Sequence, residues 1–246
     1  MNIRAVLFDL GYTLWDVDYS NEAQAYRKLR QHLVKETGAP VPSSERLRAA
    51  VSAVFLRETE AWLHGNLKQE PTEQVYRQAL ESLGLDTPAE YLSRMADGVL
   101  SRSIHYAVDP DTPRALRALK ERGLAIGAVS NTYQSSKALE KSLVRHGVMT
   151  YIDALVVSSE VGWEKPHPAI FQEALRRLGV TAAETVFVGD IVWADIQGAQ
   201  ALGMKAVLTH QYRQEEPGEA KPDLIVKRLS EVVDYVDRLN REAERS

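Results

Sequence analysis

The stretch VLFDLGYTL, residues 6–14, decides the fold because it turns abruptly from an apolar run into an acidic, glycine-containing segment. Residues 3–8 are short, mostly apolar and partly β-branched, a pattern typical of a buried strand. Asp9 and Gly11 follow that run. We therefore predict a first strand that ends at the edge of a sheet, with the carboxylate of Asp9 at its tip.

From residue 110 onward, strand patterns alternate with helical patterns. Proline in the first turn or glycine just past the last turn marks most of the helices. The strands are predicted at residues 124–129, 154–157, 185–188, 206–209 and 224–226, and the helices at residues 112–122, 135–146, 167–178, 193–202 and from residue 230. Strands that alternate with helices form parallel βαβ units. The predicted fold class is therefore α/β, with a doubly wound parallel sheet and a Rossmann-like core.

Residues 19–103 differ from the rest because they are rich in Ala, Leu, Arg, Glu and Gln, with apolar residues at helical spacing. Start signals for helices lie at Ser43, Pro71 and Pro88, and no convincing strand pattern interrupts them. The sequence therefore predicts an inserted all-helical domain at residues 19–103. The α/β core is predicted to comprise residues 1–18 and 104–246.

The charge balance argues against two classes of partner. The chain of 246 residues has 30 Lys and Arg against 34 Asp and Glu, a formal net charge of −4 at pH 7. This balance provides no global field that would attract nucleic acid or an anionic membrane. No apolar stretch approaches the roughly 20 residues of a membrane-spanning helix. We therefore expect neither nucleic acid nor a membrane as a partner.

Cysteine is absent from the chain. Its absence excludes disulfides, thiolate metal sites and a cysteine nucleophile. It also fits a reducing cytosol, so a cytoplasmic location is expected. The six histidines are scattered, and no two of them have the i, i+4 spacing of a metal pair. The chemistry of the chain must therefore be sought among other side chains.

Polar side chains follow four of the predicted strands. Asp9 follows the first, Ser130 and Asn131 follow the second, Lys165 comes after the third and Asp190 follows the fourth. The carboxyl ends of parallel strands lie at one edge of a sheet, where ligands bind, so these side chains are predicted to converge. Two acids, a hydroxyl with an amide, and an ammonium together suit phosphoryl transfer.

The same residue types predict a mechanism. Asp9 and Asp190 can hold Mg²⁺ through oxygen ligands, and the metal would offset the repulsion between a carboxylate nucleophile and a phosphate dianion. Lys165 and Ser130 can then hold the oxygens of the transferring group. Attack of a carboxylate on phosphorus gives an aspartyl-phosphate, which water later cleaves. A small phosphorylated molecule is therefore the predicted substrate.

Four segments resemble, in order and spacing, the motifs of the haloacid dehalogenase-like hydrolase superfamily. They are VLFDLGYTL at residues 6–14, VSN at residues 129–131, EKP at residues 164–166 and VGDIVWAD at residues 188–195. Each segment alone is a weak signal, but the four in order span nearly the whole chain. The resemblance implies that the helical insert is the superfamily's cap, which closes over the site and selects the substrate.

The resemblance also implies the metal site. Asp9 would be both nucleophile and metal ligand, and the backbone carbonyl of Gly11 would be a second ligand. Asp190 would ligate Mg²⁺, the implied cofactor. Asp195 would support either the waters of the metal or Lys165.

On the substrate side, the resemblance implies that Ser130 binds phosphate through its hydroxyl, with Asn131 beside it. Lys165 would orient both the nucleophile and the phosphate. Serine and asparagine here also suit the cap of the following helix, a role compatible with phosphate binding. The predicted reaction is Mg²⁺-dependent hydrolysis of a small phosphate monoester.

The chain departs from the usual phosphatase pattern at Gly11, where a second aspartate normally protonates the leaving group. General acid–base catalysis of this kind contributes roughly 10²–10⁴-fold. Three interpretations follow. A nearby acid, Asp16 or Asp18, replaces it; or the enzyme favours good leaving groups and turns over slowly; or the chain is not a phosphatase.

The dehalogenase branch of the superfamily also lacks the second aspartate and needs no metal, so 2-haloacid dehalogenation by the same nucleophile is an alternative. Asp190 argues against it, because two unneutralised carboxylates in contact raise each other's pKa and weaken the nucleophile. A further alternative is a weakly catalytic member that binds a phosphorylated ligand or a protein partner. The physiological substrate and the oligomeric state stay open at this point.

Overall fold

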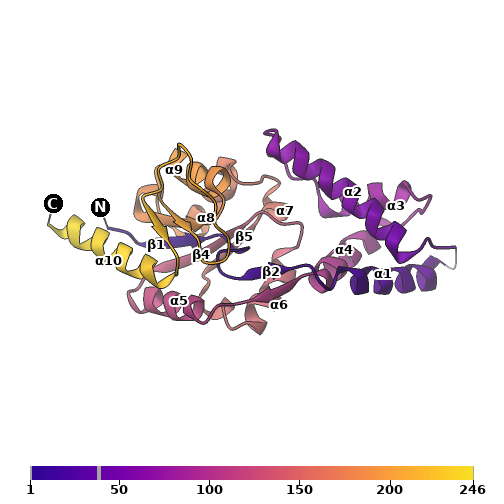
Figure 1. The fold of residues 1–246 in the computed structure, drawn as a ribbon, viewed down its shortest axis with the longest axis horizontal. Helices are drawn as coiled ribbons and strands as arrows, with labels where there is room; N and C mark the ends of the chain where they lie inside the picture. The colour runs from indigo at the N-terminus through magenta and orange to yellow at the C-terminus, as the bar shows by residue number, and fades with distance from the viewer. Residues whose placement is uncertain (1, 38–39, 246) are drawn as a thin grey trace.

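The computed structural model describes residues 2–37 and 40–245, and within these residues the main sheet has six strands. Their bounds are β1 Ala5–Phe8, β4 Ala125–Ser130, β5 Ala154–Val157, β6 Thr185–Gly189, β7 Lys205–Thr209 and β8 Leu224–Val226. They pair in parallel in the order β5-β4-β1-β6-β7-β8 (Figure 1). The chain therefore builds outward from β1 in both directions, and the predicted doubly wound sheet is confirmed.

Alternation along β1 directs its side chains into two separate cores. Val6 and Phe8 belong to one apolar cluster and Leu7 belongs to the other. Each of these side chains is fully buried, which explains why the strand reads as a continuous apolar run. Burial of one such side chain contributes about 1.5–3 kcal/mol to stability.

Helices cover both faces of the sheet. One face packs against α5 Asp111–Glu121, α6 Ser136–Arg145 and α10 Ser230–Glu244, and the other packs against α8 Pro168–Leu178 and α9 Gly198–Ala201. The short elements are α7 Ser158–Val161 and the 3₁₀ turns Met149–Tyr151 and Ala182–Glu184.

The helix predicted at residues 193–202 is wrong in its first part. The segment Val192–Gln197 is a π-helical turn, and only the short helix α9 follows it. The carboxylate of Asp195, inside the turn, bonds back to the amides of Asp190 and Ile191. Single π-helical turns of this kind occur often at functional sites.

The insert between the first two strands of the main sheet is helical, as predicted. Its helices are α1 Glu22–Thr37, α2 Ser44–Leu63, α3 Thr72–Glu81 and α4 Ala89–Ser103. They share an apolar core of their own, which includes Leu47, Val51 and Tyr76. In Figure 1 this helical unit lies at one end of an elongated molecule, and both chain termini lie at the other end. The fold is thus a Rossmann-like core with a helical cap.

A two-stranded antiparallel sheet was not predicted from the sequence. It pairs β2 Asp16–Asp18 with β3 His105–Ala107, at the two points where the chain passes between the core and the helical unit. Three residues are too few for a period-two pattern to stand out. The pairing depends on segments far apart in the chain, which local sequence does not reveal.

The helical unit also contacts the core through the end of α2 and through the loop that joins α2 to α3. The indole Nε1 of Trp62 donates a 2.8 Å hydrogen bond to the carbonyl oxygen of Lys165. Its ring centroid lies 4.7 Å from that of Trp193. The backbone N–H of Gln69 donates to the carbonyl of Gly162 at 3.0 Å. The cap is therefore bonded directly to the segment that carries a predicted catalytic lysine.

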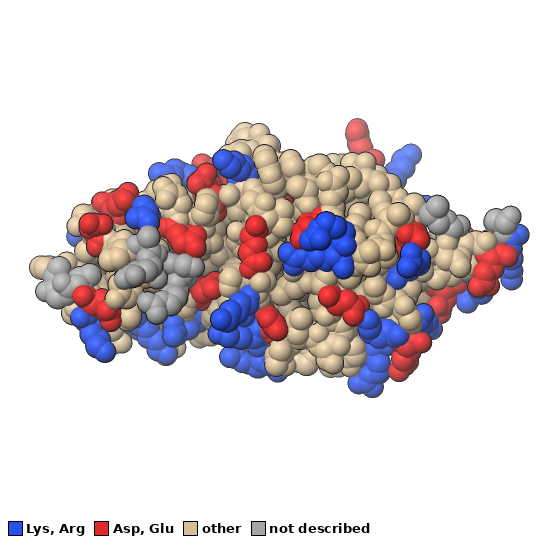
Figure 2. Space-filling view, turned by 180° about the vertical axis from the view of Figure 1, so that it is seen from behind, with Lys and Arg blue, Asp and Glu red and all other residues tan. Residues whose placement is uncertain are grey.

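Charges are mixed over the surface shown in Figure 2, where Lys and Arg side chains are interspersed with Asp and Glu. Among residues 2–37 and 40–245, no helix combines the length and apolar character needed to cross a membrane. The mixed surface charge agrees with the charge balance of the sequence.

Candidate active site

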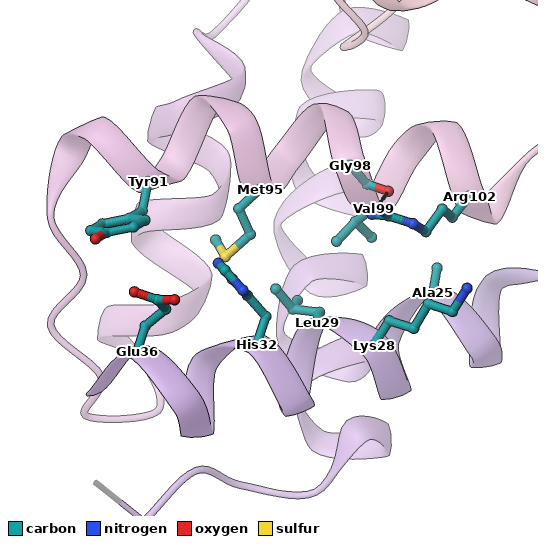
Figure 3. A pocket seen from close by; sticks show the side chains of 10 residues that line it. All are labelled: Ala25, Lys28, Leu29, His32, Glu36, Tyr91, Met95, Gly98, Val99 and Arg102. Carbon is teal, nitrogen blue, oxygen red and sulfur yellow. Dashed lines mark hydrogen bonds between the residues drawn. The ribbon is translucent and has the colours of Figure 1, made fainter. Parts of the chain in front are cut away.

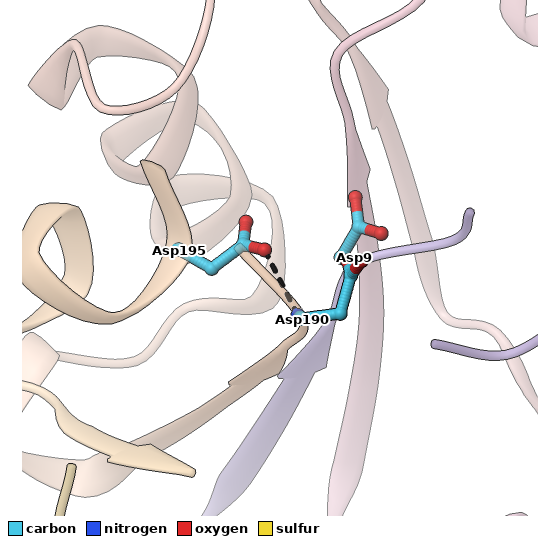
Figure 4. A group of neighbouring side chains, drawn as sticks. All are labelled: Asp9, Asp190 and Asp195. Atoms are coloured by element: carbon cyan, nitrogen blue, oxygen red, sulfur yellow. Dashed lines mark hydrogen bonds between the residues drawn. The ribbon is translucent and has the colours of Figure 1, made fainter. Parts of the chain in front are cut away.

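Three aspartates meet at the carboxyl edge of the sheet. Asp9 follows β1 and Asp190 follows its neighbour β6, while Asp195 comes from the π-helical turn. One carboxylate oxygen from each lies within 4.8 Å of the other two (Figure 4). Their exposed fractions are 7%, 1% and 0%, respectively. The fold thus concentrates three acidic groups at a place almost closed to water.

Asp195 is held by the backbone at the end of β6. Its Oδ2 accepts a hydrogen bond from the N–H of Asp190 at 3.1 Å (Figure 4) and another from the N–H of Ile191 at 2.9 Å. A Cβ atom at Gly189 would lie 2.4 Å from the Asp195 carboxyl carbon, closer than side chains tolerate. Glycine at position 189 is therefore what allows Asp195 to fold back over the strand.

Lys165 links two of these acids. Its Nζ lies 2.6 Å from Asp9 Oδ1 and 2.7 Å from Asp195 Oδ1, and its side chain is 3% exposed. Asn131 holds the lysine backbone on both sides, because its Oδ1 accepts from the Lys165 N–H at 2.7 Å and its Nδ2 donates to the Lys165 carbonyl at 3.1 Å. Asn131 thereby positions the lysine, a role that the sequence did not suggest.

Burial governs the titration of the cluster. Desolvation raises the pKa of Asp9 to about 6, although Lys165 opposes the shift. Desolvation, followed by repulsion from Asp9 and Asp195, raises the pKa of Asp190 to about 8. Burial alone would lower the pKa of Lys165, but Asp195 and Asp9 raise it. When ionised, the three carboxylates would carry more negative charge than Lys165 neutralises, and a divalent cation would relieve the repulsion that raises the pKa of Asp190.

A cavity of about 190 Å³ opens beside the cluster. Its lining residues come from the strand ends and from the β2 segment, and they are Asp9, Gly11, Tyr12, Val17, Tyr19, Ser130, Asn131, Lys165, Asp190, Ile191, Ala194 and Arg213. The predicted site residues therefore share one cavity, except Asp195, which lies behind Lys165. This volume is smaller than the roughly 300–1,000 Å³ of pockets for drug-sized ligands, so it suits a small ligand.

The structure contradicts the interpretation that Asp16 or Asp18 directly replaces the missing acid. Both side chains lie exposed on β2, and Asp18 Oδ2 accepts a 2.6 Å hydrogen bond from the hydroxyl of Ser20. Side chains alternate along a strand, so Val17 between them faces the cavity instead. Both aspartates therefore lie on the face of the strand opposite the site.

Arg213 was missed by the sequence analysis. It lies between β7 and β8, forms an ion pair with Asp190 Oδ2 and places its guanidinium carbon 5.1 Å from the centroid of the Tyr12 ring. Tyr12 has a φ of 56°, an uncommon backbone conformation for a tyrosine. The segment around Arg213 has no periodic pattern, and its partners come from other parts of the chain. Only the folded structure reveals this contact.

A larger cavity of about 490 Å³ lies within the helical unit, between α1 and α4 (Figure 3). Lys28, His32, Glu36, Tyr91 and Met95 are among the residues that line it. It shares none of the lining residues of the aspartate cavity and has a single carboxylate side chain in its lining. Size alone therefore does not mark the site of chemistry in this molecule.

Replacing Lys165 with methionine is expected to lower the free energy of unfolding by about 3–5 kcal/mol at pH 7. The change leaves Asp9 and Asp195 buried without their cation. Urea denaturation measures the effect. The matched control is Lys120→Met, because Lys120 pairs with Asp153 at the surface and its loss should cost less than about 1 kcal/mol. Equal stabilities of the two variants would contradict the structural role of Lys165.

The chain is similar to known proteins in both sequence and structure. Residues 3–203 match the family model described as haloacid dehalogenase-like hydrolase. A glyceraldehyde 3-phosphate phosphatase of Methanothermobacter thermautotrophicus is 30% identical over 228 residues, which cover 92% of this chain and 92% of that protein. A phosphoserine phosphatase of Thermus thermophilus is 32% identical, over 76% of this chain and 72% of that protein. A solved 2-haloacid dehalogenase from Pseudomonas syringae pv. Tomato DC3000 is 27% identical with a TM-score of 0.67, over 96% of this chain and 99% of that one.

Proposed function

The chain belongs to the haloacid dehalogenase-like hydrolase family, and from that premise we propose that it is a Mg²⁺-dependent phosphohydrolase of small phosphate monoesters. One observation carries the proposal: buried Asp9, Asp190 and Asp195 each place a carboxylate oxygen within 4.8 Å of the other two, an arrangement that favours a metal ion. The names of the similar proteins, phosphatases of glyceraldehyde 3-phosphate and phosphoserine, support the same substrate class.

The donor set fits Mg²⁺, which prefers oxygen ligands and few protein carboxylates. Asp9, Asp190 and the backbone carbonyl of Gly11 would hold the ion, and Asp195 would support the site from behind Lys165. Bound there, the ion would supply positive charge against the negative charges of the nucleophile and the phosphate. Asp9, Gly11 and Asp190 line the same cavity, which makes this set of ligands possible.

The reaction proposed for the chain has two displacements at phosphorus. An Asp9 carboxylate oxygen forms a bond to phosphorus while the bond to the leaving oxygen breaks, giving an aspartyl-phosphate and an alkoxide that takes its proton from water. Water then forms a bond to phosphorus while the bond to Asp9 breaks. Phosphate leaves, and the proton lost by the attacking water goes to solvent. Lys165 and Ser130 would hold the phosphoryl oxygens in both steps.

Residues 19–103 are proposed to act as a mobile cap over a core made of residues 1–18 and 104–246. Trp62 in the cap donates a hydrogen bond to the carbonyl of Lys165, so movement of the cap would directly affect the position of the segment that carries this lysine. Asn131 holds the same carbonyl from the core side. Closure would exclude bulk water from the first displacement.

Removal of the metal tests the proposal. Hydrolysis of p-nitrophenyl phosphate is expected to fall by about 10³-fold after treatment with EDTA and to recover with added Mg²⁺, because the metal contributes several kcal/mol of charge stabilisation. Added Mg²⁺ should also raise the midpoint of thermal unfolding, since it binds only the folded site. Activity that is unchanged by EDTA would overturn the metal requirement.

The competing function is dehalogenation of a 2-haloacid. It is favoured by Gly11, which removes the usual second aspartate, and by the likeness to a solved 2-haloacid dehalogenase. Chloride release from 2-chloropropionate in EDTA distinguishes the two reactions. Chloride release without hydrolysis of any phosphate ester would favour the dehalogenase. A Mg²⁺-dependent thermal shift with no turnover of either substrate class would favour a binding protein that has lost catalysis.

A further inference from the structure

Among the described residues, two cationic side chains line the aspartate cavity, and they differ in their contacts and in their exposure. The Lys165 ammonium lies between Asp9 and Asp195 and is almost completely buried. The Arg213 side chain is 40% exposed and contacts Asp190 from the open side of the cavity. In the part of the chain that the structure describes, the buried Nε of Arg213 has no hydrogen-bond partner. Arg213 therefore has donors left for another group, whereas Lys165 already uses two of its three N–H donors on Asp9 and Asp195.

The loop that carries Arg213 is anchored by the two residues that precede it. Before it, Gln211 Nε2 donates to the hydroxyl of Thr112 at 3.2 Å. The hydroxyl oxygen of Tyr212, the residue directly before Arg213, accepts a 2.8 Å hydrogen bond from the N–H of Asp109. These two contacts tie the loop to the start of α5 next to Arg213, and the Arg213 guanidinium carbon lies 5.1 Å from the centroid of the Tyr12 ring. An arginine held in this way presents its donors with little loss of conformational freedom.

The charges of the aspartate cluster indicate how Arg213 would behave once a metal is bound. When all three aspartates are ionised, as metal binding requires of the ligating carboxylates, they outnumber Lys165 and Arg213 by one negative charge. A divalent cation on Asp190 would make the cluster net positive and would compete with Arg213 for the same carboxylate. The guanidinium would then lack its partner at the mouth of the cavity, where a planar fork of donors matches a carboxylate or a phosphate.

We propose that Arg213 binds a second anionic group of the substrate, a carboxylate or a second phosphate, while the phosphate ester itself lies over Asp9. This inference rests on the proposed phosphohydrolase function and narrows its substrate class to small phosphorylated acids or bisphosphates. The cavity of about 190 Å³ places the second anion only a few bonds from the scissile phosphate. Arg213 is thus a specificity-determining residue that the four sequence motifs do not contain.

The test uses three phosphate esters that share a three-carbon chain: propyl phosphate, 3-(phosphonooxy)propanoate and propane-1,3-diol bisphosphate. Wild-type kcat/KM is expected to be higher for one of the two esters with a second anion than for propyl phosphate. In Arg213→Gln this preference should fall by about 10- to 100-fold, mainly through KM, because a charged hydrogen bond is lost. The ester whose advantage in kcat/KM over propyl phosphate falls in Arg213→Gln identifies the second anion as a carboxylate or a phosphate.

The control is Arg238→Gln, because Arg238 also lies over a tyrosine ring, that of Tyr235 at 5.2 Å, but on α10 away from the site. It should leave the preference unchanged. Calorimetry with Mg²⁺ alone gives a readout without turnover, and Arg213→Gln should bind Mg²⁺ more tightly than the wild type because a competitor for Asp190 is gone.

The outcomes separate the two proposals. No hydrolysis of any phosphate ester by the wild type, p-nitrophenyl phosphate included, would remove the proposed function. Hydrolysis with an equal loss on all three alkyl esters in Arg213→Gln would keep that function and overturn the inference, because Arg213 would then serve the transferring phosphate. Weaker or unchanged Mg²⁺ binding in this variant would also overturn it.

Discussion

Replacing Asp9 with asparagine is expected to lower kcat for p-nitrophenyl phosphate by at least about 10⁴-fold, because an amide cannot form the covalent intermediate. The variant should fold and be no less stable than the parent. It removes one of three buried carboxylates that repel one another, and Lys165 keeps its contact with Asp195. Steady-state kinetics and urea denaturation measure the two effects.

The control for this prediction is Asp18→Asn, because it makes the same chemical change on an exposed carboxylate that faces away from the cavity. Its activity should match that of the wild type. A large loss in Asp18→Asn would restore that residue as a candidate for the missing acid. Substantial activity in Asp9→Asn would mean that another group attacks the phosphorus.

The sheet could be predicted because its signals are local. Each strand is a short apolar run, and β1 is buried on both faces, so its sequence has no polar interruption before Asp9. Parallel pairing then places the ends of β1, β4 and β6 at one edge, which is why Asp9, Ser130 and Asp190 could be expected together. The convergence of these residues therefore follows from topology alone.

The remaining features depend on contacts that local sequence does not encode. Arg213 lies outside the four motifs, and its partners Asp190 and Tyr12 come from distant segments. The role of Asn131 as the support of the Lys165 backbone also needs the folded loop. These features arise from side-chain geometry between loops.

The orientation of β2 explains why nearness to Gly11 in the sequence did not identify the missing general acid. Asp16 and Asp18 lie only a few residues after Gly11, but strand alternation turns both of them away from the cavity. Val17 contributes an apolar wall instead. The described cavity lining thus contains Asp9 and Asp190 as its carboxylates, and both are assigned to nucleophilic attack and metal binding. Under the proposed assignment, the described lining of the cavity therefore offers no further carboxylate to act as the general acid.

Restoring that acid is expected to raise activity. Gly11→Asp should increase kcat/KM for alkyl phosphates such as propyl phosphate by roughly 10²-fold, at the lower end of what general acid catalysis contributes. Position 11 can accept a side chain, because a Cβ there would meet only Val17 Cγ2 at 3.6 Å, an ordinary contact. The gain should be small for p-nitrophenyl phosphate, whose leaving group departs without protonation.

Gly11→Asn is the matched control, since it adds the same volume and polarity without an acid. Kinetics across esters of increasing leaving-group pKa should show a weaker dependence in Gly11→Asp than in either the parent or Gly11→Asn. Equal rates in the two variants would mean that an aspartate at position 11 cannot reach the leaving oxygen in this cavity. A selective gain with poor leaving groups would instead show that Gly11, and not the arrangement of Asp9, Lys165 and Asp190, limits the hydrolysis of alkyl esters by this chain.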